Sequence, residues 1–489
     1  MNILVIDVGT SSMRGILLSH DGEELAGKQC FYKSSYGQNG RVEQAPSDWE
    51  QALYEIVKEL SAKAREQGWD IECISLTAQR SSVIPVDAHM HPLQNAIMWQ
   101  DKRANEICAR LEPENEKIVS LCGSRANPVF SGGKMSWIKK HCPEIYRNTS
   151  KFMVIPDYLI YRMTGNVCTD HTYGSRSLLM NLRTCEWEPE LLRLFDIEKE
   201  KLCPLVEPGS ICGVTCGEFS KITGCREGIP VVTAGGDQQC GAVGQGVVKK
   251  GILSITAGTG GYLEAASEGV PDHLQPDIVC NVSSVKGQYI LEASVLTCCS
   301  AFDWFRKEFC GEADYEKINK DLAQVPPGAN GCLCIPCFQG RSTPDWNNEA
   351  KGMFANVTLA TTKQDMLRSI LEGISYELAN GMDSIKKYLE ISAIYANGGL
   401  TESPVFNEIL CNVCGTKITR RGKADATARG ALMIAASALG IYDSVEHAFD
   451  AISRKDRTKE YCPSREIAEV YGKCREEMNQ TYRKMWNRG

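Results

Sequence analysis

One carboxylate, Asp237, stands among glycines in the stretch AGGDQQCGAVGQGV, residues 234 to 247. A short apolar strand precedes it, and glycines without side chains let a backbone approach another backbone or a ligand. Two interpretations remain open from these residues. Asp237 is either the N-cap of a helix that follows a tight turn, or a base carried on a hinge.

A second carboxylate, Asp7, ends the apolar strand of ILVIDVGTSSMRG, which begins at residue 3. The turn that follows contains Gly9, Thr10, Ser11 and Ser12, and GILLSHDG returns as a second strand. This pattern predicts a β-hairpin over residues 3 to 22. The carboxylate suits a metal ion, and the backbone N–H groups and hydroxyls suit phosphate oxygens. An ordinary hairpin turn is the alternative.

An internal repeat links this hairpin to the second half of the chain. Residues 252 to 259, ILSITAGT, align without gaps on residues 3 to 10, ILVIDVGT, and also continue into a strand. Two such units predict a duplicated domain with facing loops. Thr256 replaces Asp7 in the second copy, which predicts a metal site on one side and a neutral phosphate cradle on the other.

Further polar groups follow other apolar strands. Gln79 and Arg80 end the strand in IECISLTAQRSS, and Trp99, Gln100, Asp101 and Arg103 follow another short strand. Ligands collect at strand ends in α/β sheets, while surface salt bridges at strand ends are the alternative. Asp157 stands at a helix start, where these residues alone favour an N-cap.

Several elements must position these residues. The apolar spacing of Trp49, Leu53, Ile56, Val57 and Leu60 predicts a helix that starts at Ser47 or Asp48. FSGGKMSWIKKH predicts a turn at Gly132 and Gly133 and then a helix, within a largely helical stretch from 104 to 150. A Gly398-Gly399 turn connects a strand to a helix. Residues 457 to 489 are charged and predicted to be helical.

Composition narrows the class of protein. A chain of 489 residues predicts at least two domains. The net charge of −7, without a Lys/Arg run, gives no sign of nucleic-acid binding. No apolar run is long enough for a membrane span, and the N-terminus lacks a signal-peptide pattern. We therefore expect a cytoplasmic enzyme or binding protein, with no membrane partner.

The 23 cysteines form two clusters that resemble metal sites. Cys332, Cys334 and Cys337 form one, and Cys411 with Cys414 forms the other. The second pair lies in an expected amphipathic helix, and no second pair follows at zinc-ribbon spacing. We therefore expect reduced thiols that act as small core residues.

The ordered segments IDVGTSSMRG, TAQRS, MWQDKRA, FSGGKMSWIKKH, GGDQQCGAVGQG, ITAGTGGY, GRSTPDWNNEAKG and ANGGLTESPVFNEIL resemble the FGGY family of carbohydrate kinases. The resemblance covers essentially the whole chain. It implies an α/β fold of two actin-like, ribonuclease H-like ATPase domains, as in the sugar kinase, Hsp70 and actin superfamily. The domains would span residues 1–245 and 246–489, with the active site in a central cleft between them.

The resemblance also implies roles for individual residues, with ATP and Mg²⁺ as cofactors. Asp237 would be the general base and, with Asp7, a metal ligand. ATP and its phosphates would be bound by Gly9, Thr10, Ser11, Ser12, Arg14, Gly258, Thr259, Gly260, Gly398, Gly399 and Asn407. The substrate would contact Gln79, Arg80, Trp99, Asp101, Asp157, Asp237 and Gln238.

The expected substrate is a small sugar or polyol. Ser81 stands where glycerol kinases have a polyol-binding Glu, and Val129 stands where they have a Tyr. We favour a ketopentose such as xylulose, with glycerol or erythritol as alternatives. Other hypotheses are a non-kinase ATPase switch, a cysteine-rich ATPase activator with an iron–sulfur cluster, and an inactive sugar sensor. A homodimer or homotetramer is expected.

Overall fold

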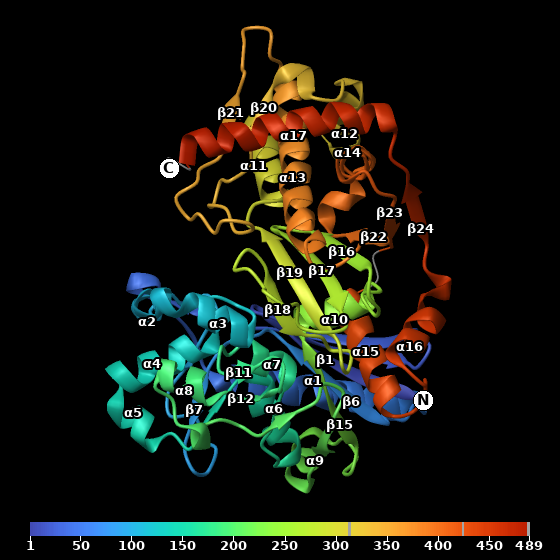
Figure 1. Ribbon diagram of the computed structural model, residues 1–489. Helices are drawn as coiled ribbons and strands as arrows, with labels where there is room; N and C mark the ends of the chain where they lie inside the picture. The colour runs from blue at the N-terminus through green and yellow to red at the C-terminus, as the bar shows by residue number, and fades with distance from the viewer. Residues whose placement is uncertain (312–313, 423–424, 487–489) are drawn as a thin grey trace. The chain divides into compact units, whose positions relative to one another are not determined.

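The computed structural model of the protein describes residues 1–311, 314–422 and 425–486. They cluster into two compact units (Figure 1). Unit 1 comprises Met1–Val248, Glu268–Ile290 and Ala424–Lys455, and unit 2 comprises Lys249–Ser267, Leu291–Lys423 and Asp456–Gly489. Each unit therefore draws on several separate stretches of the chain. The predicted boundary between residues 245 and 246 stays a prediction.

A six-stranded sheet forms the centre of unit 1, in the order β14-β15-β6-β1-β2-β3. Its strands are β1 (Asn2–Val8), β2 (Ser12–Ser19), β3 (Glu24–Phe31), β6 (Cys73–Ala78), β14 (Ile211–Val214) and β15 (Pro230–Gly236). β6 pairs in parallel with β1 and with β15, whereas β2 is antiparallel to β1 and places Arg14 opposite Asp7. The predicted hairpin at the N-terminus is confirmed.

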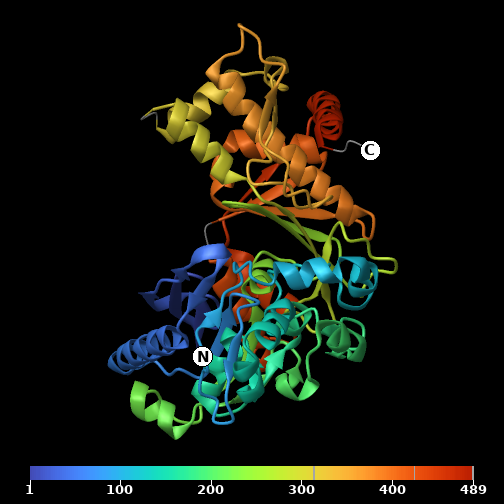
Figure 2. The same ribbon diagram turned by 90° about the vertical axis from the view of Figure 1, so that its left-hand side faces the viewer.

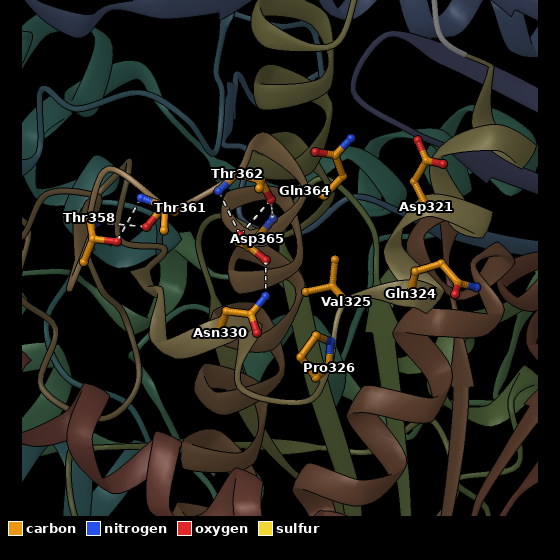
Figure 3. Close-up of a pocket in the computed structure, with 11 residues that line it drawn as sticks. Asp321, Gln324, Val325, Pro326, Asn330, Thr358, Thr361, Thr362, Gln364 and Asp365 are labelled. Atoms are coloured by element: carbon orange, nitrogen blue, oxygen red, sulfur yellow. Dashed lines mark hydrogen bonds between the residues drawn. The ribbon is translucent and has the colours of Figure 1, made fainter.

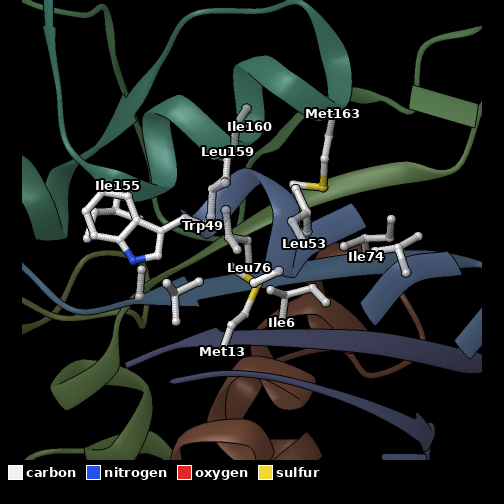
Figure 4. Packing of buried hydrophobic residues seen from close by; sticks show 14 of the residues in the cluster. Ile6, Met13, Trp49, Leu53, Ile74, Leu76, Ile155, Leu159, Ile160 and Met163 are labelled. Atoms are coloured by element: carbon white, nitrogen blue, oxygen red, sulfur yellow. The ribbon is translucent and has the colours of Figure 1, made fainter. Parts of the chain in front are cut away.

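Alternate side chains of β1 enter two different hydrophobic cores. Leu4, Ile6 and Val8 pack with helices α1 (Pro46–Gln67), α6 (Ile155–Thr164) and α9 (Gly217–Thr223). Figure 4 shows part of this core, in which Trp49 and Leu53 of α1 lie over the strands. Ile3 and Val5 pack with α10 (Asp237–Gly244), α15 (Ala426–Ala438) and α16 (Val445–Ile452). The sheet is thus covered by helices on both faces, as expected for buried parallel strands.

A third core of unit 1 lies in the region predicted to be helical. It is formed mainly by α2 (Asn105–Leu111), α3 (Asn115–Cys122), α4 (Ser131–His141), α5 (Pro143–Asn148) and α8 (Pro189–Phe195). The core also includes Val83 and Ile97, which form an isolated antiparallel β-bridge, and Phe152. Val83 directly precedes β7 (Ile84–Val86), Ile97 belongs to β8 (Ala96–Ile97), and Phe152 belongs to β9 (Lys151–Met153). The helical prediction for residues 104 to 150 is confirmed.

The start of α1 differs from the prediction. The helix begins at Pro46, and its N-cap is Ala45, which makes no side-chain cap bond. A proline fits the first turn because the N–H that it lacks has no helical partner there. Asp48 lies inside the first turn, where a carboxylate favours the positive end of the helix dipole. The prediction of Ser47 or Asp48 as the cap is therefore wrong.

The start of α4 also differs from the prediction. Gly132 and Gly133 lie inside the helix, which begins at Ser131. A Cβ atom on Gly132 would stand 2.4 Å from the carbonyl oxygen of Ser177. The glycine therefore allows close packing of α4, and the predicted turn there is wrong.

The sheet of unit 2 repeats the strand order of unit 1. The sheet has seven strands in the order β18-β19-β17-β16-β22-β23-β24, in which β18 is Val279–Val282, and the last six match β3-β2-β1-β6-β15-β14. They are β16 (Ile252–Ala257), β17 (Gly261–Ser267), β19 (Tyr289–Val295), β22 (Ala393–Asn397), β23 (Ile418–Arg421) and β24 (Thr458–Tyr461). β16 is antiparallel to β17 and parallel to β22. The predicted duplication is confirmed.

Helices of unit 2 include α11 (Cys299–Phe309), α12 (Tyr315–Gln324), α13 (Lys363–Lys386), α14 (Pro404–Cys414) and α17 (Arg465–Trp486). Gly381 of α13 allows contact with Leu263 and Ala293 of the sheet, 3.2 and 3.3 Å from an added Cβ. α17, red in Figures 1 and 2, joins α13 through a 2.9 Å hydrogen bond from Arg368 Nη2 to Tyr471 Oη.

The C-terminal segment is only partly helical. β24 precedes α17, so the prediction of helix from residue 457 is wrong at its start. Residues 487–489 of that prediction lie outside the described residues. In the described part of the chain, no helix is both long and apolar enough to cross a membrane.

All 23 cysteines lie in the described residues, and all are free thiols. Cys334, Cys337, Cys411 and Cys414 are buried, whereas Cys462 alone is exposed. Within the described ranges, no group of three or more His, Cys, Asp and Glu side chains could hold a metal ion. Burial raises the pKa of the Cys414 thiol to about 12.

Two glycines allow α10 and α15 to touch along their backbones. A Cβ atom on Gly244 would stand 1.9 Å from the carbonyl oxygen of Ala426, and one on Gly430 would stand 1.8 Å from that of Cys240. Because real Cβ contacts are never so short, either substitution must separate the two helices.

We therefore expect Gly430→Ala to destabilise unit 1 by about 3 kcal/mol and to lower its thermal unfolding midpoint by roughly 5 °C or more. Circular dichroism during heating measures this change. Gly241→Ala on α10 is the matched control, because its nearest contact would be an ordinary 3.6 Å to Thr427 Oγ1. An equal loss in both variants would show that the close helix contact is not the cause.

Candidate active site

Parallel strand pairing brings three predicted groups to one edge of the unit 1 sheet. In register, Asp7 of β1 pairs with Thr77 of β6, and Thr77 pairs with Gly235 of β15. Arg80 follows the end of β6 by two residues, and Asp237 directly follows β15. Because parallel strands end at a common edge, these side chains collect there.

Asp7 is a nearly buried carboxylate paired with Arg14. It is 8% exposed, and its Oδ2 lies 2.6 Å from Arg14 Nη2. Burial raises the pKa of Asp7 to about 6, against the opposing effect of Arg14, and the carboxylates of Asp237 and Asp425 add to the rise. An additional cation beside Asp7 would stabilise the charged form of its carboxyl group.

The predicted phosphate turn begins with a tight backbone bond. Gly9 N donates to Ser12 O over 2.9 Å. Tyr32 Oη donates to Gly9 O over 2.7 Å, and Tyr32 N donates to Ser11 O over 3.0 Å. The turn is therefore fixed by Tyr32, which the sequence analysis did not find because no motif surrounds it.

Two predicted substrate residues bind this turn. Gln79 Nε2 donates to Gly9 O over 3.1 Å, and Trp99 Nε1 donates to Thr10 Oγ1 over 3.1 Å. Thr10 Oγ1 in turn donates to Gln79 Oε1 over 3.3 Å. The structure thus connects the predicted phosphate-binding and substrate-binding residues through Thr10.

Asp237 is the first residue of α10, and its N-cap is Gly236. The interpretation of Asp237 as the N-cap is therefore wrong. Its Oδ1 accepts a 2.8 Å bond from Gln238 N and lies 3.7 Å from Arg80 Nε. The side chain is 28% exposed, which leaves the carboxylate accessible to a hydroxyl.

The backbone before Asp237 is held by several hydroxyls. Thr77 Oγ1 and Tyr173 Oη donate to Gly235 O over 2.8 and 2.9 Å. Gly236 N donates to Thr172 Oγ1 over 2.9 Å. Gly235 has a φ of +101°, a conformation that favours glycine. Thr172 and Tyr173 belong to the short helix α7 (His171–Ser175), which the sequence analysis missed.

Arg80 contacts the start of α10 at two places. Besides its approach to Asp237, its Nη1 donates to Gln239 Oε1 over 3.3 Å. A Cβ atom on Gly236 would stand 2.7 Å from Arg80 Cδ, so glycine is needed for this packing. Arg80 therefore packs against the side chain of Gln239. The neighbouring residue, Gln238, contacts the carboxylate of Asp237 through its backbone N–H.

Asp101 and Asp157 are less accessible than the other predicted substrate residues. Asp101 is 1% exposed and binds Arg103, with Oδ2 2.7 Å from Arg103 Nη2, and accepts a 2.7 Å bond from Val42 N. Asp157 is 2% exposed and accepts a 3.0 Å bond from Val154 N. Asp157 is thus the third residue of α6, whose N-cap is Val154, so the interpretation of Asp157 as the N-cap is wrong. The substrate roles of both carboxylates stay predictions.

Lys134 fixes the loop that carries Val129. Its Nζ donates to the carbonyl oxygens of Pro128, Val129 and Phe130 over 2.7, 2.7 and 3.2 Å. The side chain is fully buried, and burial lowers the pKa of Lys134 to about 7. No sequence pattern marks this residue, because a lysine in an amphipathic helix is normally exposed.

In unit 2, the predicted Gly258–Gly260 turn connects β16 to β17. Gly258 N donates to Gly260 O over 3.0 Å, and Cys299 N, at the start of α11, donates to Gly258 O over 2.8 Å. Ser300 Oγ donates to Thr259 O over 2.9 Å. The turn is thus held by the first residues of α11.

The predicted adenosine residues follow the neighbouring strand, β22. Gly398 has a φ of +94°, and a Cβ atom there would stand 2.5 Å from Ala257 O. Asn407 is 1% exposed, and its Nδ2 donates to Thr401 O over 2.7 Å. Because β16 and β22 are parallel, the two glycine turns lie at one edge of this sheet.

A separate pocket of about 510 Å³ lies in unit 2 at the N-terminus of α13. Figure 3 shows its polar lining, which includes Asp321, Asn330, Thr362 and Asp365. Thr362 and Asp365 form a capping box. None of the predicted site residues is among the described residues that line this pocket, so it is not the site predicted from the sequence.

Solved sugar kinases share this fold across nearly the whole chain. The xylulose kinase from Lactobacillus acidophilus has a TM-score of 0.92 at 23% identity, covering 100% of this chain and 99% of its own. Plasmodium falciparum glycerol kinase, solved with ADP, has a TM-score of 0.90 at 24% identity and covers 98% of each chain. The duplicated α/β structure is thus the actin-like ATPase fold of the sugar kinases.

Two family models identify the group more closely. The N-terminal and C-terminal domains of the FGGY family of carbohydrate kinases match residues 2–244 and 253–439. The chain belongs to the FGGY family of carbohydrate kinases, and is an enzyme of the kinase class that uses ATP.

Curated relatives are similar at modest identity. The chain is 26% identical to the xylulose kinase of Bacillus subtilis (strain 168) over 455 residues, which covers 93% of this chain and 91% of the relative. It is 29% identical over 468 residues to the glycerol kinase of Alkalilimnicola ehrlichii, covering 92% of this chain and 93% of the relative.

The lowered pKa of Lys134 predicts a pH-dependent stability. Between about pH 7 and pH 10 the unfolded chain binds a proton that folded Lys134 has released. The free energy of unfolding should therefore rise with pH in this window, by at most about 1.4 kcal/mol per pH unit from this group. Lys134→Met should remove that contribution, as measured by urea unfolding at several pH values.

Lys140→Met provides the control on the same helix, because Lys140 is exposed. It should keep the pH dependence of the wild type. An unchanged pH dependence in Lys134→Met would show that Lys134 keeps an ordinary pKa in the folded protein.

Proposed function

We propose that the chain transfers a phosphoryl group from ATP to a hydroxyl of a small sugar or polyol, with a ketopentose such as xylulose as the favoured acceptor. The main support is the common edge of β1, β6 and β15, which collects Asp7, Arg80 and Asp237. Relatives named xylulose kinase and glycerol kinase support the same chemistry.

Asp237 is proposed as the general base. A sugar hydroxyl is a poor nucleophile, so a carboxylate that accepts its proton assists phosphoryl transfer. Asp237 begins α10 on a strand end held by Thr77, Thr172 and Tyr173. Its carboxylate is thus held in position yet 28% exposed, as a base that must meet a substrate requires.

The residues of unit 1 fit a magnesium nucleotide. Asp7, with Asp237, would hold Mg²⁺, since both offer carboxylate oxygens and charge favours a cation beside the nearly buried Asp7. Arg14 and the turn from Gly9 to Ser12 would bind phosphate oxygens. Bound Mg²⁺-ATP supplies the transferred phosphoryl group and neutralises its charge.

The residues of unit 2 fit the remaining parts of ATP. Gly258, Thr259 and Gly260 would bind phosphate through backbone groups of their turn. A Cβ atom on Gly399 would meet nothing within 4 Å, which leaves room beside that backbone. Asn407 Oδ1 is buried without a hydrogen-bond partner among the described residues, so it offers an acceptor for the adenosine.

The choice of a ketopentose as the acceptor of the phosphoryl group is based on Ser81 and its surroundings. Ser81 is 3% exposed, has a φ of +72° and donates a 3.5 Å bond from Oγ to Arg176 O. It therefore lacks the carboxylate that would bind the hydroxyls of glycerol. Glycerol and erythritol remain alternative acceptors. Assembly as a homodimer or homotetramer and a cytoplasmic location are further proposals.

Family membership weighs against the ATPase-switch and cysteine-rich activator hypotheses, because the FGGY family consists of carbohydrate kinases. An inactive sugar sensor is also disfavoured, since Asp7 and Asp237 are both retained. A coupled ADP-release assay distinguishes these possibilities, because a sensor would bind sugar without turnover.

We expect Asp237→Asn to retain nucleotide binding, because Asp7 remains and asparagine still offers an oxygen to Mg²⁺. Sugar phosphorylation should fall by about 10² to 10⁴-fold, because the proton acceptor is lost. Calorimetry with ADP and coupled ADP-release assays measure the two properties. Asp443→Asn is the control, since the side chain of Asp443 is 96% exposed. Near-normal turnover by Asp237→Asn would exclude Asp237 as the base.

We expect a screen of glycerol, erythritol, and D- and L-ketopentoses and ketohexoses to give the highest kcat/KM with a ketopentose. The physical reason is that Ser81 is neutral. The residue offers a hydroxyl group in place of the carboxylate that would bind the hydroxyls of glycerol. ADP release in the presence of each compound is the measurement. Preference for glycerol would contradict the proposed acceptor but not the kinase class.

A further inference from the structure

Arg14 lies between two carboxylates of unit 1. Its Nη2 is 2.6 Å from Asp7 Oδ2, and its Nη1 is 2.6 Å from Asp425 Oδ2. Each carboxylate therefore takes a different nitrogen of one planar guanidinium. Such charge-assisted contacts fix both the position and the plane of the group.

Asp425 is itself held by the fold. It is the N-cap of α15, where its Oδ1 accepts a 3.1 Å bond from Ala428 N. α15 is fixed to the sheet by a 2.9 Å bond from Ser75 Oγ to Ala431 O, and it touches α10 through Gly430. Asp425 thus connects Arg14 to α15. This helix packs against α10, which begins with Asp237.

Asp7, the first of the two carboxylates, would have two positively charged partners. In the proposed function Asp7 binds Mg²⁺, and the same Oδ2 now contacts Arg14. A guanidinium whose sole carboxylate partner is Asp7 would compete with the metal ion for that partner. The second partner, Asp425, reduces this competition because it neutralises Arg14 from the opposite side.

We propose that Asp425 is a positioning residue that keeps Arg14 at the phosphate turn while Asp7 binds Mg²⁺. This inference rests on the proposed roles of Asp7 and Arg14. Asp425 acts through Arg14 and contacts neither the sugar nor the metal ion. Its effect should therefore appear in the Mg²⁺ dependence of nucleotide binding.

The size of the expected change in Mg²⁺ dependence follows from the exposed fractions of the Arg14 and Asp425 side chains. The side chains of Arg14 and Asp425 are 38% and 28% exposed, so water and salt screen their attraction. We expect loss of the Asp425 charge to raise the Mg²⁺ concentration at half-maximal ADP binding by about two- to fivefold.

Asp425→Asn is the test variant, because asparagine caps helices as well as aspartate does and so preserves α15. Calorimetric titration of ADP at increasing Mg²⁺ concentrations should show the shift, with an unchanged thermal unfolding midpoint. Asp314→Asn is the matched control: Asp314 caps α12 in unit 2 with a 2.6 Å bond from Lys317 N. It should leave the Mg²⁺ dependence unchanged.

A double-mutant cycle separates positioning from a general charge effect. In an Arg14→Ala background, Asp425→Asn should cause no further shift if Asp425 acts through Arg14. The same shift in both backgrounds would overturn the proposal, as would an Asp425→Asn variant that behaves like the wild type. A wild type whose ADP binding does not depend on Mg²⁺ would instead contradict the proposed role of Asp7.

Discussion

The parallel hydrogen bonding of β6 with β1 on one side and β15 on the other determines where the polar side chains of unit 1 lie. A slip of one residue would turn the side chains of a strand to the opposite face of the sheet. The side chains of Asp7, Gln79, Arg80 and Asp237 would then be displaced relative to one another. The helices reinforce this register, because alternate residues of β1 fill two separate cores. The hydrophobic pattern of the strands thus positions the charged residues that follow them.

Local patterns in the sequence predicted much of this arrangement. The hairpin at Asp7, the strand end at Gln79 and the duplicated ILSITAGT segment are each encoded within a few consecutive residues. The contacts of Tyr32, Thr172, Tyr173 and Lys134 were not predicted, because they join segments distant in sequence and involve common residue types. For Asp101, the pattern WQDKR could not show whether the carboxylate faces a ligand or Arg103. Helix starts were misplaced at α1, which begins with Pro46 after Ala45, and at α4, whose glycines lie inside the helix.

The two units use one strand order for different chemistry. Asp7 lies in β1 of unit 1 opposite Thr77, whereas Thr256 occupies the equivalent place in β16 of unit 2 opposite Asn397. The next strand is followed by Gln79 and Arg80 in one unit and by Gly398 and Gly399 in the other. Duplication therefore supplied two similar edges, and substitution placed carboxylates at one and glycine turns at the other. Backbone contacts dominate the second edge because glycines expose the peptide groups.

The burial of the cysteines has a practical consequence for solution studies. Desolvation raises the pKa of thiols such as Cys122 and Cys240 to about 12, so few of them exist as reactive thiolates at neutral pH. Cys462, which follows β24 in unit 2, is the exposed exception among the 23 cysteines. A maleimide fluorophore should therefore attach preferentially at this natural position, without prior removal of the other thiols. The protein thus carries its own attachment point for spectroscopy of unit 2 during nucleotide binding.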